Sequence, residues 1–166
     1  REIAAGKIIF CEGYTAAGNP YFNRIPFRPV KGEILYIRPE DSVEFIFNRQ
    51  IFIIPWDEGF YKVGATYDWN YKDTRPTIQA KNYLEDKLNR FLNVNYRITG
   101  QVAGIRPATL DRRPVIGLHP EHSSVGIFNG LGSKGVSLAP YFARMFVEYL
   151  LNNRELDKEV DIKRFY

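Results

Sequence analysis

The hydrophobic and polar positions of the chain change their period along its length. From Gly32 onward, short runs of β-branched and aromatic residues alternate with turn residues, which is typical of strands. Strands this close in sequence predict an antiparallel sheet, because parallel neighbours need long crossover connections. The runs span 33–37, 43–47, 51–55 and 60–66, and an earlier buried-strand pattern spans 7–11.

A helical period replaces the strand period over 76–92, where Pro76 suits the first helical position. Strand character returns over 96–103 and in the short pieces 114–117 and 124–129. The Gly- and Pro-containing region 14–31 predicts a loop. The apolar face of the helix is predicted to consist of Ile78, Leu84, Leu88, Phe91 and Leu92.

A second helix is predicted over 136–151, and Pro140 restricts its start to about 133–137. The residues after Asn152 form a charged tail. The pattern as a whole predicts an α+β fold, with an antiparallel sheet that carries one helix and a C-terminal strand, glycine loop and helix. The inward positions of the second helix are predicted to be Ala139, Ala143, Phe146, Val147 and Leu150.

Composition narrows the function classes. The net charge of +4 is spread through the chain, so we expect no nucleic-acid binding. We find no signal peptide and no apolar run long enough to span a membrane.

Cys11 is the single cysteine, which excludes an intrachain disulfide and fits a reducing compartment. We therefore expect a cytoplasmic protein. Cys11 is expected to be inert inside its strand. His119 and His122 flank Pro120 in a predicted turn, and we expect surface residues there rather than metal ligands.

The glycine-rich stretch 130–135, between the last predicted strand and the second helix, is the strongest candidate for chemistry. It matches G-x-G-x-x-G, and a helix start presents unpaired N–H groups and partial positive charge. Three interpretations stay open: a dinucleotide fingerprint, a turn that only packs, and a loop that faces a flavin ring. A fingerprint would need a further parallel strand that ends in an acid, and only a short segment with early acids follows the helix.

Arg106 is the strongest single candidate residue. Pro107 holds it in an extended conformation, and an Arg at a strand end can present a two-pronged donor to a carboxylate. Taken alone, the same residue is better interpreted as a surface or salt-bridged Arg.

Several motifs in order resemble the flavin-dependent D-amino-acid oxidase and glycine oxidase family, over about residues 7–152. The family shows G-x-R-P, then D-x-x-P-x-I-G, then a strand, a glycine loop and G-[IV]-x-L-A-P into a helix; the matching segments are GIRP at 104–107, DRRPVIG at 111–117 and GVSLAP at 135–140. Further similar segments are KIIFCEG at 7–13, RPVKGEIL at 28–35, FIIP at 52–55 and VGAT at 63–66.

The resemblance implies a domain organisation. Residues 1–30 would end an FAD-binding domain, 31–103 would form the substrate-binding domain, and 104–166 would return to the FAD-binding domain. The family's nucleotide-binding N-terminal half is absent, and the chain begins with Arg1 rather than Met, so we expect a C-terminal part of a longer flavoenzyme. The chain alone is then expected to be inactive and to bind little or no FAD, with the missing half as its partner.

The resemblance also implies roles for individual residues. Arg106 matches the family's carboxylate-binding Arg, so we expect it to bind substrate and to orient it for catalysis. The residues that match cofactor-binding positions are Gly13, Gly130, Gly132, Ser133, Lys134, Gly135 and Val136.

Two positions depart from the family. Phe52 stands where D-amino-acid oxidases carry a Tyr hydroxyl at the substrate, and Ser133 stands where glycine oxidases carry a second Arg. Arg49 or Lys134 are candidates to compensate for the missing donors. We therefore expect an FAD-dependent enzyme that oxidises the carbon–nitrogen bond of an amino acid or related amine carboxylate by hydride transfer to flavin, with substrate, electron acceptor and oligomeric state left open. The alternatives are a small NAD-binding unit over 124–166 and a non-catalytic binding module.

Overall fold

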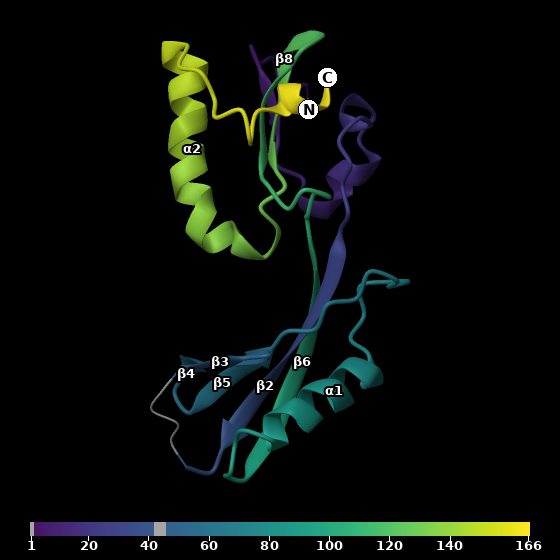
Figure 1. Ribbon diagram of the computed structural model, residues 1–166, viewed down its shortest axis with the longest axis vertical. Coiled ribbons are helices and arrows are strands. Elements are labelled where there is room, and N and C mark those ends of the chain that lie inside the picture. The colour runs from purple at the N-terminus through teal and green to yellow at the C-terminus, as the bar shows by residue number, and fades with distance from the viewer. Residues whose placement is uncertain (1, 42–45) are drawn as a thin grey trace. The chain divides into compact units, whose positions relative to one another are not determined.

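The computed structural model describes residues 2–41 and 46–166 and divides the chain into two compact units (Figure 1). One unit combines the chain up to Pro29 with Arg106–Tyr166, and the other is the continuous segment Val30–Ile105. We call them the terminal unit and the central unit. The assignment of these units to flavin and substrate domains stays a prediction.

The central unit contains the predicted antiparallel sheet. Its strand order is β3-β4-β5-β2-β6, and β5 pairs antiparallel with both β2 and β4. Residues 43–45 of the predicted strand 43–47 lie outside the described residues. The elements of the unit are β2 (Val30–Pro39), β3 (Phe47–Arg49), β4 (Ile51–Asp57), β5 (Phe60–Gly64), α1 (Ile78–Asn89) and β6 (Tyr96–Arg106).

The core of the central unit lies between one face of this sheet and helix α1 (Figure 1). Side chains alternate between faces along a strand, so every second residue is buried over 33–37 of β2, 51–54 of β4 and 60–63 of β5. Leu84 and Leu88 of α1 complete the layer as predicted, and Phe91 and Leu92 pack at its margin. The strand residues of this core are Leu35, Ile37, Ile51, Ile53, Tyr61 and Val63.

The start of helix α1 differs from the prediction. Thr77 is the N-cap, and its hydroxyl accepts a hydrogen bond from the N–H of Ala80 at 3.2 Å. Pro76 therefore precedes the helix instead of opening it. Ile78 is 60% exposed, because the first helical residue points away from the sheet, and Ala80 takes the buried place.

A buried ion pair fixes this helix start to the sheet. Lys31 Nζ lies 3.2 Å from Glu33 Oε1, and both side chains are at most 3% exposed. Glu33 also accepts hydrogen bonds from the N–H and hydroxyl of Thr77 and from the side chain of Gln101. Lys31 and Glu33 both lie in the segment 28–35, and each neutralises the charge of the other.

The terminal unit is built on a three-stranded sheet of order β1-β8-β7, in which β1 runs parallel and β7 antiparallel to β8. Both faces of the sheet are covered, since Val115 and Ile116 point to opposite sides and belong to different core clusters. Its regular elements are β1 (Ile8–Phe10), β7 (Val115–His119), β8 (His122–Asn129) and α2 (Gly135–Asn152). The 3₁₀ helices are η1 (Gly13–Gly18), η2 (Pro20–Phe22), η3 (Gly132–Lys134) and η4 (Ile162–Phe165).

Helix α2 buries only part of the predicted face. Phe146 is buried and Leu150 packs around it as predicted, but Ala143 and Val147 are exposed. Both sides of this helix are apolar, so the helical period alone does not identify the side that faces the sheet. The residues that pack around Phe146 are Phe142, Met145, Tyr149 and Leu150.

Two further predictions for the terminal unit need correction. The segment 14–31 is not purely loop, because η1 and η2 lie within it and Phe22 is buried. Cys11 follows β1 rather than lying inside it and is exposed, although partial burial raises the pKa of its thiol. The charged tail also contributes apolar residues to the core, since Leu156, Val160 and Ile162 are buried. Among the described residues, no helix combines the length and apolar character needed to cross a membrane.

Candidate functional site

The glycine loop begins where β8 ends, at the buried residue Asn129. Its side-chain NH₂ donates to the carbonyl of Gly13 at 2.9 Å, and its side-chain oxygen accepts from the N–H of Gly130 at 2.8 Å. Asn129 therefore brings together two of the predicted cofactor-binding glycines, although 116 residues separate it from Gly13 in sequence.

Three of the predicted cofactor-binding glycines, Gly13, Gly130 and Gly132, have backbone angles that favour glycine. The φ angles are 64° at Gly13, 76° at Gly130 and 55° at Gly132. At Gly130 an added Cβ would also lie 3.1 Å from the carbonyl oxygen of Arg113 and 3.1 Å from Thr109 Cγ2, whereas at Gly13 it would meet nothing within 4 Å. Packing thus requires Gly130 to be glycine, while the space beside Gly13 is open to a ligand.

The strand end that carries Arg106 adjoins this loop. The N–H of Gly132 donates to the carbonyl of Pro107 at 3.2 Å, and Ala108 forms an isolated antiparallel bridge with Leu131. Arg106 is the last residue of β6, immediately before Pro107. The backbone that holds Arg106 and the backbone of the glycine loop therefore lie side by side, while the role of the guanidinium stays a prediction.

The start of helix α2 has no side-chain cap in the described part of the chain. Its N-cap residue is Lys134, and the 3₁₀ turn η3 separates the glycine loop from the helix. Gly132 and Lys134 donate their N–H groups to Pro107 and Leu131 within the protein. The first-turn N–H groups of Gly135 and Val136 are then the best candidates to meet an electron-rich ligand, because such groups have no intrahelical acceptor.

The side chains around this helix start are open. Ser133 and Lys134 are exposed, and Val136 is 98% exposed. The exposed surface at this helix start therefore combines glycine backbone with the side chains of Ser133, Lys134 and Val136. Backbone N–H groups at a helix start can stabilise negative charge on a ligand.

Phe52 and Arg49 lie in the central unit. Phe52, on β4, pairs with Gly64 on β5, and a Cβ on Gly64 would lie 2.9 Å from its ring, so the ring covers the glycine. Arg49 ends β3 and is exposed, beside Gln50, whose φ of 63° makes the tight turn to β4. Their membership of the substrate site stays a prediction.

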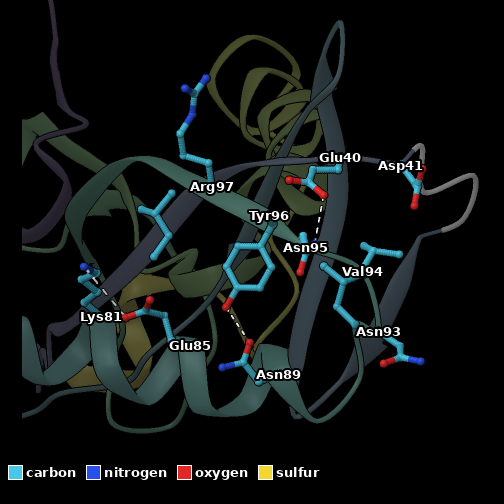
Figure 2. A pocket seen from close by; sticks show the side chains of 12 residues that line it. Glu40, Asp41, Lys81, Glu85, Asn89, Asn93, Val94, Asn95, Tyr96 and Arg97 are labelled. Carbon is cyan, nitrogen blue, oxygen red and sulfur yellow. Dashed lines mark hydrogen bonds and ion pairs between the residues drawn. The ribbon is translucent and has the colours of Figure 1, made fainter.

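The central unit also has a cavity of about 960 Å³ at the Tyr96 end of β6, shown in Figure 2. Its polar groups pair with one another: the Tyr96 hydroxyl donates to Asn89 at 2.7 Å, and Asn95 donates to Glu40 at 3.0 Å. Burial, and then the nearby Glu85, raises the pKa of Tyr96. None of the residues predicted to form the site lines this cavity, and we assign it no function.

His119 is buried at 5% exposure, which corrects the expectation of a surface residue, while His122 is exposed. The Nδ1 atom of His119 accepts a hydrogen bond from the N–H of Glu121 at 3.1 Å. Its Nε2 atom lies 3.1 Å from the hydroxyl of Tyr166, which donates its own hydrogen to the Tyr21 carbonyl. Because Nδ1 is an acceptor and the hydroxyl hydrogen is already used, Nε2 carries the ring proton. Ligand atoms of His119, Glu121 and His122 lie within 4.8 Å of one another, but both ring nitrogens of His119 are already used.

The sequence analysis missed Asn129 and Thr109, the two side chains that organise the loop. Thr109 is 1% exposed, and its hydroxyl donates to the carbonyl of Arg113 at 2.7 Å. The Asn129-Gly130 dipeptide was the available signal for Asn129. No signal in the sequence marked Thr109: its hydroxyl partner, Arg113, lies only four residues away, but its methyl contact with Gly130 depends on two distant loops coming together.

The arrangement after α2 disfavours the dinucleotide fingerprint. In the described residues that follow the helix, Asp161 makes an isolated parallel bridge with Ile116, and the segment otherwise forms turns and η4. The parallel strand β1 precedes the loop in sequence instead of following it. The strand–helix–strand unit that the fingerprint requires is therefore not formed here.

Comparison with known proteins identifies the class of protein that has this fold and loop. Residues 1–149 match the DAO family model of FAD-dependent oxidoreductases. The chain belongs to this family. A glycine oxidase of Bacillus subtilis is 30% identical over 140 residues, which cover 80% of this chain and 37% of that enzyme. A second glycine oxidase, from Bacillus licheniformis, is 32% identical and is covered to 36%.

Solved structures share the fold. The iminodiacetate oxidase of Chelativorans sp. BNC1 superposes with a TM-score of 0.80 at 21% identity, over 96% of this chain and 47% of that chain. The glycine oxidase of Geobacillus kaustophilus gives 0.77 at 24% identity, over 98% and 45%. The predicted fold class is confirmed, and the chain spans little more than a third of the curated relatives and about half of these structures.

Proposed function

We propose that the protein containing this chain oxidises the carbon–nitrogen bond of an amino acid or related amine carboxylate and uses FAD as its cofactor. The observation that carries the proposal is the hydrogen bond from the Gly132 N–H to the Pro107 carbonyl, 3.2 Å long. It joins the strand end bearing a cationic side chain to a loop of backbone donors. Membership of an FAD-dependent oxidoreductase family supports the same chemistry.

The residues present fit a flavin. Gly13 and Gly132 are partly exposed and carry no side chain, and the uncapped start of α2 offers N–H groups and partial positive charge. The bound flavin supplies the hydride acceptor. The helix start would stabilise the negative charge that develops on the ring edge nearest to it.

Arg106 would hold the substrate carboxylate through paired N–H donors and so fix the orientation of the α-carbon. Phe52 provides no hydroxyl, so the Arg106 guanidinium would carry more of the carboxylate recognition than in relatives with a Tyr there. The nucleotide-binding N-terminal half of the family would complete the cofactor site. A cytoplasmic location and the absence of nucleic-acid partners stay predictions.

The test of the Arg106 role is Arg106→Ala in the full-length protein. We expect kcat/KM to fall by about 100-fold, the equivalent of two to three kcal/mol, with a raised KM and with flavin retained. Arg106→Lys should recover part of the loss because it keeps the charge without the fork. Kinetics that stay unchanged in Arg106→Ala would remove this residue from the site.

The absorption spectrum of the purified full-length protein tests the cofactor. A bound flavin absorbs in the visible range, and we expect a yellow protein that is bleached by an amino-carboxylate substrate. A colourless protein that binds nicotinamide nucleotides would favour the NAD-binding alternative, and one that binds neither would favour the binding module.

A further inference from the structure

We propose that residues 154–166 act as a strap that positions the glycine loop, and that Arg164 is the positioning residue. The inference rests on the proposed function and extends it to a segment outside the family match, which ends at residue 149. The family model therefore assigns no role to the strap, although the solved structures compared above cover 96% and 98% of this chain.

The strap is anchored in the core of the terminal unit. Ile162 is fully buried, and Leu156 and Val160 are 7% and 4% exposed. The N–H of Ile116 on β7 donates to the carbonyl of Val160 at 2.9 Å. An added Cβ on Gly117 would lie 2.8 Å from Ile162, so β7 provides the space that the strap fills.

Arg164 reaches from the strap to the loop between β6 and β7. Its Nε lies 3.1 Å from Asp111 Oδ2, and one terminal nitrogen donates to the carbonyl of Pro114 at 2.8 Å. The other terminal nitrogen donates to the carbonyl of Asp161 at 3.1 Å, within the strap. The side chain is only 15% exposed, and the ring of Phe165 lies 4.3 Å from its Cζ. The guanidinium therefore joins the two segments in one fixed orientation.

The electrostatics of Asp111 support the same geometry. Burial alone would raise the pKa of this carboxyl, but hydrogen bonds from the Arg113 N–H and from the Arg164 guanidinium, together with the charge of Arg164, hold the pKa below its usual value. The Asp111 carboxylate is thus the charged acceptor that Arg164 binds at neutral pH.

The loop that Arg164 holds is packed directly against the glycine loop. The carbonyl oxygen of Arg113 and the methyl group of Thr109 both lie where a Cβ of Gly130 would come within 3.1 Å. The other end of the same loop accepts the Gly132 N–H at Pro107. Any shift of residues 109–114 would therefore move Gly130 and Gly132, and with them the start of α2.

The consequence concerns the cofactor rather than stability alone. Without the guanidinium, the Pro114 carbonyl and the Asp111 carboxylate lose a charged donor, and residues 109–114 can move away from Gly130. The N–H groups at the start of α2 would then be held less tightly where the flavin ring edge lies. Arg164 touches neither cofactor nor substrate, and it acts through the loop.

The experiment uses the full-length protein with Arg164→Ala, Arg164→Lys and the control Arg154→Ala. Arg154 lies in the same strap, is 75% exposed and pairs only distantly with Glu148, at 3.7 Å. The measurements are the FAD dissociation constant, the position of the visible flavin absorption maximum, and hydrogen exchange of the 130–136 amides in the apoprotein. For Arg164→Ala we expect about tenfold weaker FAD binding, a shifted maximum and faster exchange.

Arg164→Lys keeps the charge and should give an intermediate result, and Arg154→Ala should match the wild type. An Arg164→Ala protein with wild-type affinity, spectrum and exchange would overturn the inference, and so would equal changes in Arg154→Ala. If Arg164→Ala does not fold, Arg164→Lys decides by the same criteria. A wild-type protein without flavin would overturn the proposed function, and the exchange of 130–136 would then still decide the role of Arg164.

Discussion

The central unit and the terminal unit bury their apolar side chains in different ways. The central unit is one continuous segment whose sheet and helix α1 enclose a single core around Leu84 and Leu88. The terminal unit joins both ends of the chain around a sheet of three strands, with a separate core cluster on each face. All strand pairs of the first lie within residues 30–106, whereas the second pairs β1 with β8, more than a hundred residues away.

The two helices show the same contrast. Helix α1 has one buried apolar side and a polar outer side. Helix α2 buries Phe146 and its neighbours and also carries a second apolar stripe at helical spacing on the exposed side. The stripe consists of Val136, Pro140, Ala143, Val147 and Leu151. The terminal unit therefore exposes apolar surface that the proposed N-terminal half of the enzyme would cover.

The largest effect should come from the buried ion pair of the central unit. Glu33→Ala leaves Lys31 charged and buried without its partner, so we expect the free energy of unfolding to fall by about 3–5 kcal/mol. Urea denaturation followed by circular dichroism measures the change. Asp86→Ala removes an exposed helix pair with Arg90 and should cost no more than about 0.5 kcal/mol. A similar cost for both variants would contradict a special role of the buried pair.

The exposed stripe of α2 provides the next test. Leu151 is 74% exposed here, so Leu151→Ser should be nearly neutral unless another part of the protein covers it. In the full-length protein we expect a loss of about 1.5–3 kcal/mol, because an apolar side chain would be removed from an interface. The measurement is thermal or chemical unfolding of the full-length variant. A cost below about 0.5 kcal/mol would show that the stripe faces solvent.

Loss of the Tyr166 hydrogen bonds is expected to have a smaller effect on the stability of the terminal unit. Tyr166→Phe removes the donor to the Tyr21 carbonyl and leaves Nε2 of the buried His119 without its partner. We expect a loss of about 0.5–1.5 kcal/mol. Tyr141→Phe is the control, since Tyr141 is 61% exposed on α2. Equal stabilities of the two variants would show that the Tyr166 contacts contribute little to the free energy of unfolding.

The smallest expected effect is the pH dependence of the Asp111–Arg164 pair. The pKa of Asp111 is lower in the folded chain than in the unfolded one, so its contribution is present above the unfolded value of about 4 and is lost as the pH falls through the folded value. Solvent screens the partly exposed carboxylate, so the effect should not exceed about 1 kcal/mol. The Asp111→Asn variant should lose less free energy of unfolding than the wild type as the pH falls from about 5 to about 2. An unchanged acid-side slope would exclude a contribution from the pair.

The predicted elements and the observed ones agree best where a single physical requirement acts. The alternation of β2, β4 and β5 and the inward Leu84 and Leu88 follow from one covered face. The prediction is wrong where the same sequence pattern is compatible with two ways of packing a helix. Ala143 and Val147 lie on an apolar side of α2, but the opposite side carries the larger residues and packs on the sheet.

The candidate site shows the same division. The glycines and Arg106 were identified from motifs, because unusual backbone angles and a fixed strand end require particular residue types. Asn129 and Thr109 were not identified, since an Asn or a Thr acquires its role only from the partners that folding brings to it. The burial of His119 likewise depends on Tyr166, 47 residues away.

The family, the antiparallel sheet with its helix, and the loop and strand end proposed to meet the cofactor and the substrate could be predicted from the sequence. These features are local, since they depend on period, on glycine and proline geometry, and on motifs a few residues long. Local patterns left open which residues of α2 are buried, how Gly13 reaches Gly130, and that the charged tail contacts the loop before β7. Those outcomes depend on contacts between segments far apart in sequence, whose partners no local pattern specifies.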